Sequence, residues 1–197
     1  SPSFLLTQSG LMIFFGNDSG NIYAIDINGN LQSGFPINNI NQFSFDSIVG
    51  SIVFEDLDSD GLAEIVFGDA QGKLYVLKAL DNSYSSFTEY NSFPISNVFA
   101  FTSSPNITDI DNDNDFEIFA GTSGDVVVTD IKEDIVSNNS SYWNIYRGDY
   151  LRNGYYVYES SCNVGDLNSD GIINILDIVT LVNIVIDNPD ISDQEFC

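Results

Sequence analysis

Three stretches of the chain set carboxylate and amide side chains at alternate positions, the pattern that surrounds a hard cation with oxygen. The most complete stretch is a twelve-residue loop with oxygen groups at positions 1, 3, 5, 7, 9 and 12. Gly171 falls at position 6, where such a loop turns sharply. The predicted calcium ligands of this loop are Asp166, Asn168, Asp170, the Ile172 carbonyl, Asn174 and Asp177.

Two shorter loops carry carboxylates at positions 1, 3, 5 and 9 and a main-chain carbonyl at position 7. The first loop supplies Asp56, Asp58, Asp60, the Leu62 carbonyl and Glu64. The second supplies Asp109, Asp111, Asp113, the Asp115 carbonyl and Glu117. Asn114 stands where the first loop has Gly61, and because Asn tolerates the left-handed conformation we expect the same turn. Together the loops predict about three bound Ca²⁺ ions.

The composition excludes several function classes. The chain has 197 residues and a net charge of −24, with 29 acidic residues against 5 basic ones. Such a surface repels phosphate backbones and anionic lipid, so nucleic acid and membranes are unfavourable partners. The sequence contains no His, which excludes Ser–His and Cys–His catalysis and most zinc chemistry. No apolar run is long enough for membrane insertion.

A repeat with a period near fifty residues organises the first part of the chain. Gly16, Gly68 and Gly121 are 52 and 53 positions apart, and each lies between two short apolar runs. A fixed period of this size indicates propeller blades or a solenoid. The following glycines, Gly20, Gly72 and Gly124, are expected to provide the positive φ of a hairpin turn.

The units are predicted to cover residues 1–46, 47–101 and 102–158. The acidic loops precede the second and third hairpins. In the first unit the short turn Gln8–Gly10 replaces the acidic loop, so we expect it to bind no metal. Phe35–Pro36 and Phe93–Pro94 are expected at the outer edges of the first two units, since Pro suits an edge strand.

This combination of period and acidic loops resembles the FG-GAP repeat, the VCBS-type, integrin-α-like β-propeller blade whose calcium loop joins its first two strands. The resemblance covers about residues 1–131. It implies a mainly β fold: a partial propeller of about three four-stranded blades within residues 1–158. Three blades do not close a ring, since propellers typically have at least four. Tyr142–Tyr156 resembles a segment that often trails such propellers; its Trp143 is expected to pack against the last blade, with a sugar-stacking platform as the alternative.

The last calcium loop has an exiting helix but no entering one and closes with Asp, which resembles one repeat of a type I dockerin. The match covers Gly165–Ile186, within a module expected at residues 162–197. The resemblance implies docking onto a cohesin-like domain or a second dockerin repeat. The predicted helix, Asn174–Ile186, is apolar over most of its circumference, so we expect it to be buried on more than one side. The predicted partner-binding residues are Ile175, Leu176, Ile178, Val179, Val182 and Ile186.

Cys162 and Cys197 are the only cysteines, and they bracket this calcium loop and its helix. Dockerin repeats bring their flanking segments together, so the resemblance implies a disulfide between the two. A secreted chain also favours the oxidised form. Two free thiols are the alternative.

The resemblances imply a secreted protein, extracellular or at a bacterial-type cell surface. The expected function is a non-catalytic calcium-binding propeller region anchored through a dockerin-like module. The alternative is the C-terminal part of a polysaccharide-degrading lyase or glycosidase whose catalytic residues lie upstream. A polysaccharide or another extracellular ligand is the candidate partner of the propeller. No carboxylate pair is left uncommitted for glycoside cleavage, so catalysis within this segment is not expected. Ser1–Leu6 lacks signal-peptide features, and we expect the sequence to begin inside a longer protein.

Overall fold

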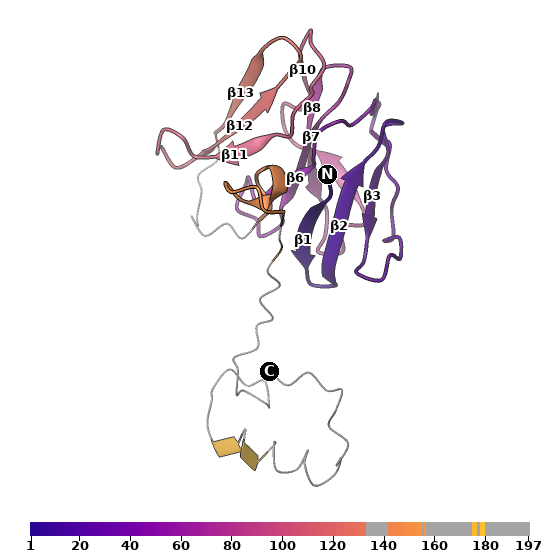
Figure 1. Ribbon diagram of the computed structural model, residues 1–197, viewed down its shortest axis with the longest axis vertical. Coiled ribbons are helices and arrows are strands. Elements are labelled where there is room, and N and C mark those ends of the chain that lie inside the picture. Colours follow the sequence, from indigo (N-terminus) through magenta and orange to yellow (C-terminus); the bar gives the residue numbers. More distant parts are fainter. Residues whose placement is uncertain (133–141, 155, 157–174, 177, 180–197) are drawn as a thin grey trace. The chain divides into compact units, whose positions relative to one another are not determined.

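The computed structural model describes residues 1–132, 142–154, 156, 175, 176, 178 and 179. The chain divides into two compact units, Ser1–Tyr156 and Val157–Cys197 (Figure 1). In the described part, the first unit holds all the strands. They form separate antiparallel sheets, none of which closes on itself.

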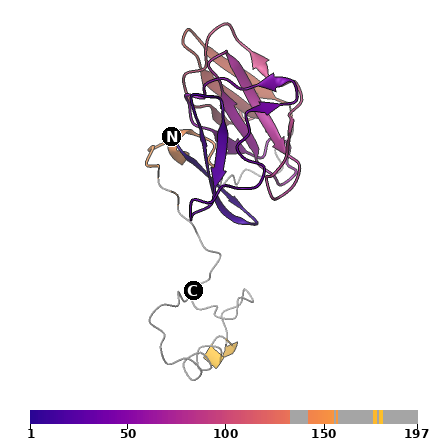
Figure 2. The ribbon, with the colours of Figure 1, turned by 90° about the vertical axis from the view of Figure 1, so that its right-hand side faces the viewer.

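Three sheets follow one another along the first unit, in the same order as their strands in the chain (Figures 1 and 2). The first sheet contains β1 (Ser3–Thr7), β2 (Gly10–Gly16) and β3 (Ile22–Ile25). The second contains β6 (Val53–Glu55), β7 (Glu64–Gly68), β8 (Lys73–Ala79), β9 (Phe87–Glu89) and β10 (Ile95–Ser96). The third contains β11 (Asn106–Thr108), β12 (Phe116–Gly121) and β13 (Val126–Ile131). A small hairpin of β4 (Asn39–Ile40) and β5 (Phe43–Ser44) lies between the first two sheets in sequence.

The predicted period is confirmed by the register of the second and third strands. Ile13 pairs with Ile25 in the first sheet, Ile65 with Leu77 in the second and Ile118 with Thr129 in the third. The expectation of four strands in each unit is only partly correct. The second sheet has an outer edge made of two short strands, β9 and β10, which both pair with β8. The corresponding segment of the first unit makes isolated bridges to β3, and the third sheet has three strands among the described residues.

The outer segments of the first two units both contain the predicted proline. The peptide bonds Phe35–Pro36 and Phe93–Pro94 are both cis. Phe93–Pro94 lies between β9 and β10. The two units therefore share the backbone form of their outer edge as well as its sequence.

The repeated glycines serve close packing more than turn geometry. A Cβ on Gly16 would overlap Ile48, and a Cβ on Gly68 would overlap Phe101, in each case on the segment that leads into the next unit. Gly20 and Gly72 have the predicted positive φ. The same expectation is wrong for Gly124: it is not among the positive-φ residues, and a Cβ there would overlap the Phe99 ring. Its turn is one residue shorter, so the glycine is needed for space alone.

Two apolar clusters hold the sheets together. One joins the first and second sheets through residues such as Phe14 and Phe67. The other joins the second and third through residues such as Val66 and Ile118. All five residues of β7 are buried, so the second sheet is covered on both faces. This explains why β7 reads as a continuous apolar run after Glu64.

A segment distant in sequence, residues 142–154, joins the first strands of all three sheets. The Trp143 carbonyl accepts the N–H of Phe54 in β6 at 3.0 Å, and the Asn144 carbonyl accepts that of Ile107 in β11 at 3.0 Å. The Trp143 ring packs edge-on against Phe4 of β1, with ring centroids 5.0 Å apart. This segment, which includes the 3₁₀ helix η1 (Tyr146–Gly148), is called the tail segment below.

The tail segment decides between the two interpretations of Trp143. The indole is only 5% exposed and belongs to the apolar cluster of the first two sheets. The expectation that Trp143 packs in the core is therefore confirmed, but it packs against the first two sheets and not against the last blade. The sugar-stacking alternative is wrong for Trp143 because a ring buried in the core offers no face to a ligand. Within the described residues, no helix has the length and apolar character needed to span a bilayer.

Replacing Trp143 tests whether the tail segment holds the sheets together. We expect Trp143→Ala to lower the free energy of unfolding by about 3–5 kcal/mol, because it leaves a cavity between two sheets. Tyr150→Ala is the matched control in the same segment, since Tyr150 is 79% exposed and should change stability by less than about 0.5 kcal/mol. Urea unfolding followed by fluorescence and circular dichroism measures both. Equal stability of the two variants would contradict this role.

Candidate metal centres

The two shorter acidic loops occupy equivalent places in the second and third sheets. One joins β6 to β7 and the other joins β11 to β12. Their ends are fixed by the last pair of each strand register, Glu55 opposite Glu64 and Thr108 opposite Glu117. The glutamate at loop position 9 is therefore the first or second residue of a strand. Its carboxylate accepts a hydrogen bond from the loop that precedes the strand.

Three of the four predicted side-chain ligands come together in each loop. Positions 1, 3 and 9 each place a carboxylate oxygen within 4.8 Å of the others. In the 56–64 loop these are Asp56, Asp58 and Glu64, and in the 109–117 loop Asp109, Asp111 and Glu117. Position 5, Asp60 or Asp113, is not part of these groups. The carbonyl roles of Leu62 and Asp115 stay predictions.

The turn of the two loops is the same despite their different sequences. The Gly61 N–H donates to Asp56 at 2.9 Å, and the Asn114 N–H donates to Asp109 at 3.3 Å. Gly61 has a φ of 88° and Asn114 a φ of 69°. The expectation that Asn can take the place of Gly in this turn is confirmed. The aspartate at position 1 thus organises the loop backbone through hydrogen bonds.

The two glutamates are the least exposed carboxylates of the loops. Glu64 is 0% exposed and Glu117 5% exposed. One oxygen of each accepts a loop N–H, from Leu57 at 2.7 Å and from Ile110 at 2.8 Å. The second oxygen of each is buried and has no hydrogen-bond partner among the described residues. The pKa of Glu64 is raised to about 9: burial is the largest cause, the Leu57 N–H opposes it, and the charge of nearby Asp58 adds to it.

Each loop is also reached by a lysine that the sequence analysis did not assign to it. Lys78 of β8 contacts Asp58 directly and lies 2.8 Å from Asp60. Lys132, just after β13, lies 3.3 Å from Asp115 and 3.6 Å from Asp113 and contacts Asp130. Burial lowers the pKa of Lys78, but the hydrogen bonds with Asp58 and Asp60 outweigh it and raise that pKa above its usual range.

The side chain of Asp115 is a candidate ligand that the sequence did not predict. The sequence assigned it only a carbonyl, but its carboxylate lies within 4.8 Å of those of Asp113 and Glu117. Burial and the hydrogen bond with Asp113 together raise the pKa of Asp115 to about 6, against the hydrogen bond with Lys132. The 109–117 loop therefore contains two overlapping carboxylate groups that share Glu117, whereas the 56–64 loop contains one.

In the first unit, the short turn Gln8–Gly10 takes the place of the acidic loop, as the sequence predicts. Thr7 pairs with Gly10 across the turn, and the Thr7 hydroxyl accepts the Ser9 N–H at 3.2 Å and donates to the Gly10 carbonyl at 2.9 Å. The same two strands are thus joined by a turn that closes through a threonine and contains no carboxylate. The absence of metal binding at this turn stays a prediction.

The third predicted calcium loop lies outside the described residues. This applies to Asp166, Asn168, Asp170, Ile172, Asn174 and Asp177, to the cysteine pair Cys162 and Cys197, and to Val182 and Ile186. Four residues of the predicted helix are described. Ile175, Leu176, Ile178 and Val179 are helical, and their side chains are about half exposed or more.

No protein-family model matches this chain, and comparison with curated proteins found no match.

The buried glutamate gives a test of the metal-free protein. The Glu64 pKa rises from an ordinary 4.5 to about 9 on folding, so the folded state retains a proton that the unfolded chain has lost. Stability should therefore fall as the pH rises between these values. In chelator at pH 8 we expect Glu64→Gln to raise the free energy of unfolding by about 2–4 kcal/mol, because the neutral amide removes this cost.

Urea unfolding between pH 5 and pH 9 measures this effect. Asp18→Asn, at an exposed turn of the first unit, is the control and should leave the pH dependence unchanged. A Glu64→Gln variant as pH-sensitive as the parent protein would contradict the assignment of the buried charge.

Proposed function

We propose that residues 1–156 are an open arc of calcium-stabilised β-propeller blades, a non-catalytic binding or display region of an extracellular protein. The observation that carries the proposal is the pair of buried glutamates, Glu64 and Glu117. Each has one carboxylate oxygen bonded to its loop and the other buried without a partner among the described residues. A carboxylate oxygen of each glutamate also lies within 4.8 Å of carboxylate oxygens of two loop aspartates.

The chemistry of these groups favours a hard divalent cation. An unpartnered buried carboxylate is unfavourable, and gathering two more carboxylates around it adds like-charge repulsion. A bound cation removes both costs at once. All of the candidate ligands are oxygens, which suits Ca²⁺ or Mg²⁺ rather than Zn²⁺ or copper. Ca²⁺ is the better match, since it accepts irregular loops with six to eight ligands, whereas Mg²⁺ requires near-ideal octahedral geometry.

A structural role follows from where the loops lie. Each loop connects the first two strands of its sheet, so an ion would fix that hairpin and the entry of the glutamate into the core. The loop carboxylates are all occupied by the ion, by loop N–H groups or by a lysine. No further acid–base pair remains in them for catalysis. The affinity expected for short exposed loops is micromolar or weaker, which suits an extracellular calcium level.

The C-terminal module extends this proposal from sequence. The Asp166–Asp177 loop is proposed to bind a third Ca²⁺ and to order a helix that docks onto a cohesin-like domain or a second dockerin repeat. The half-exposed apolar side chains of Ile175, Ile178 and Val179 support such a surface, because contiguous apolar patches on soluble proteins mark interaction sites. This anchoring implies a secreted or cell-surface location.

Calcium stoichiometry tests the loops one by one. Isothermal titration calorimetry and native mass spectrometry of the full chain should give three Ca²⁺ equivalents. Asp56→Asn with Asp58→Asn should remove one, and Asp109→Asn with Asp111→Asn should remove another. Asp26→Asn, whose carboxylate closes a turn in the first unit, is the control and should remove none. Unchanged stoichiometry in either double variant would rule out that loop.

Removing the charge of Lys78 tests whether Ca²⁺ binds to the carboxylates of the 56–64 loop that this lysine contacts. Its ammonium occupies the same carboxylates that Ca²⁺ needs, so Lys78→Met should raise the calcium affinity of the 56–64 loop by about tenfold. Lys73→Met removes the same charge from a lysine that lies over the Phe43 ring, and it should leave the affinity unchanged. A weaker affinity in Lys78→Met would show that the lysine supports the site instead of competing with the ion.

A further inference from the structure

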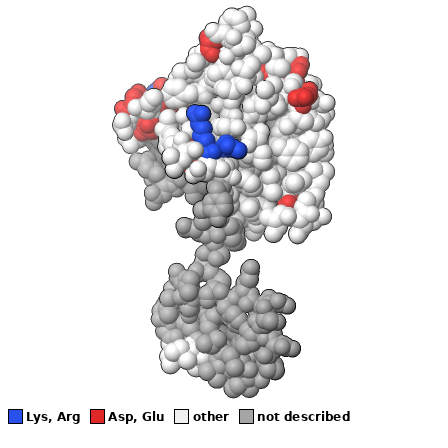
Figure 3. Space-filling model, in the orientation of Figure 1, with Lys and Arg blue, Asp and Glu red and all other residues white. Residues whose placement is uncertain are grey.

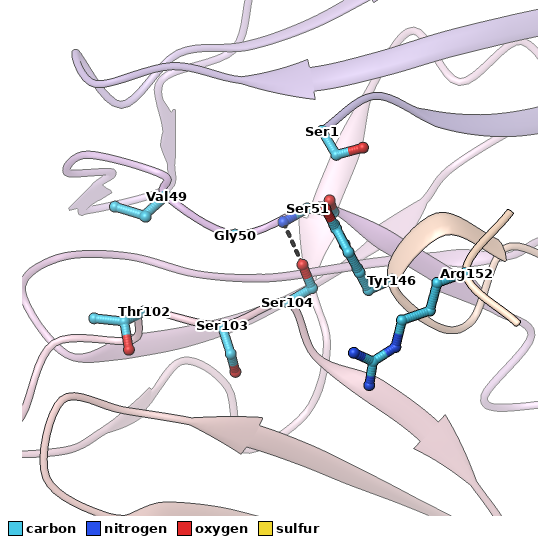
Figure 4. A pocket seen from close by; sticks show the side chains of 9 residues that line it. All are labelled: Ser1, Val49, Gly50, Ser51, Thr102, Ser103, Ser104, Tyr146 and Arg152. Atoms are coloured by element: carbon cyan, nitrogen blue, oxygen red, sulfur yellow. Dashed lines mark hydrogen bonds between the residues drawn. The ribbon is translucent and has the colours of Figure 1, made fainter. Parts of the chain in front are cut away.

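A cavity of about 420 Å³ lies where the chain enters the first strands of the three sheets (Figure 4). Ser1, Ser51 and Ser104 line it, and each stands two residues before its strand, β1, β6 or β11. The three serines are therefore equivalent positions of the repeat. The tail segment completes the wall with Tyr146 and Arg152.

The Ser104 hydroxyl can donate a hydrogen bond in this cavity. The Ser51 N–H donates to the Ser104 hydroxyl at 2.7 Å, so the Ser104 hydrogen stays available to another acceptor. Ser51 is 2% exposed, and its own hydroxyl has no hydrogen-bond partner among the described residues. Because that hydroxyl oxygen is itself buried, it is not exposed to a ligand in the cavity, and Ser104 supplies the available donor.

The charge of the cavity is opposite to that of the chain. Of its nine lining residues six carry a hydroxyl group, one carries a guanidinium and none carries a carboxylate. This is unusual in a sequence with 29 acidic residues against 5 basic ones. Figure 3 shows a band of basic side chains in the middle of the corresponding face, with acidic side chains toward its margins. An anionic group is therefore better accommodated here than elsewhere on this face.

The backbone of Arg152 is fixed by hydrogen bonds within the tail segment, and its side chain is exposed. The Asp149 side chain accepts the backbone N–H of Asn153 at 3.0 Å, and its backbone carbonyl accepts the N–H of Arg152 at 3.0 Å. The Arg147 guanidinium donates to the Arg152 carbonyl at 3.3 Å. Among the described residues no acidic side chain forms an ion pair with Arg152. Its guanidinium extends toward Ser103 and Ser104 (Figure 4).

We propose that this cavity binds one carboxylate-bearing, hydroxylated ring, the chemistry of an acidic sugar. The Arg152 fork matches a carboxylate, and the serine and tyrosine hydroxyls match ring hydroxyls. The volume is within the range of small-molecule sites. The cavity lies at the start of β6 and β11, whereas the acidic loops follow the ends of these strands. Binding here therefore does not depend on the proposed calcium sites.

Calorimetric titration of the full chain with D-glucuronate tests the proposal, in the presence of calcium. We expect saturable binding of D-glucuronate and none of D-glucose, which has the same ring without the carboxylate. Arg152→Ala should weaken D-glucuronate binding at least about tenfold, and Ser104→Ala several-fold. Lys73→Ala removes the same charge outside the cavity and should bind like the parent protein.

Three controls make the outcome decisive. Arg152→Lys keeps the charge but loses the planar fork, so an intermediate affinity is expected even if the alanine variant folds poorly. Asp56→Asn with Asp58→Asn should retain D-glucuronate binding, which separates this site from the calcium loops. Sulfate should bind more weakly than D-glucuronate.

The proposal is overturned if D-glucuronate does not bind, if D-glucose binds equally well, or if Arg152→Ala and Lys73→Ala behave alike. Sulfate binding as tightly as D-glucuronate overturns the sugar assignment in favour of a simple anion site.

Discussion

The open edges of the first strands are the constraint on which the arrangement of the sheets depends. β6 and β11 are each the last strand of their sheet, so one side of each backbone lacks a strand partner. Such edges must be covered to avoid pairing with other chains. The tail segment does this with two carbonyls, those of Trp143 and Asn144, which accept N–H groups from both strands. Asn144 also donates to the buried Glu55 of β6 at 2.9 Å. The tail segment, which follows β13 in the chain, thus covers strand edges that the sheets leave open.

The repulsion among the carboxylates is reduced because lysine side chains lie at the two acidic loops, where the negative charge is concentrated. Lys78 and Lys132 reach the two acidic loops, and they are two of only five basic residues in the chain. Without a metal, the lysines reduce the repulsion among the aspartates, but they leave the inner oxygens of Glu64 and Glu117 unpartnered among the described residues. A small divalent ion can approach those oxygens more closely than an ammonium on a flexible chain. The negative charge of the proposed metal sites is therefore partly neutralised by lysine before a metal ion binds.

Local features of the fold were predictable from the sequence, and contacts between distant segments were not. The period, the hairpins, the acidic loops and the role of Asn114 all follow from residue types at short spacing, where turn chemistry dominates. Lys78 was missed because it lies on β8, and only the register of β8 against β7 brings it to the loop. The packing of Trp143 against the first two sheets likewise depends on contacts between segments distant in sequence. Gly124 was misjudged because one deleted residue changes the turn while the crowding against Phe99 remains.

The repeat and the tail segment contribute differently to recognition. The serines at the cavity recur with the period, because each unit enters its first strand in the same way. Three equivalent hydroxyls alone provide little selectivity, since they accept and donate in many directions. Arg152 and Tyr146 occur once and come from the segment that covers the strand edges. The element that holds the sheets together therefore also supplies the charge that would distinguish one ligand from another. A loss of Trp143 packing should consequently disturb the cavity as well as the core, whereas changes in the calcium loops act at the opposite ends of the same strands.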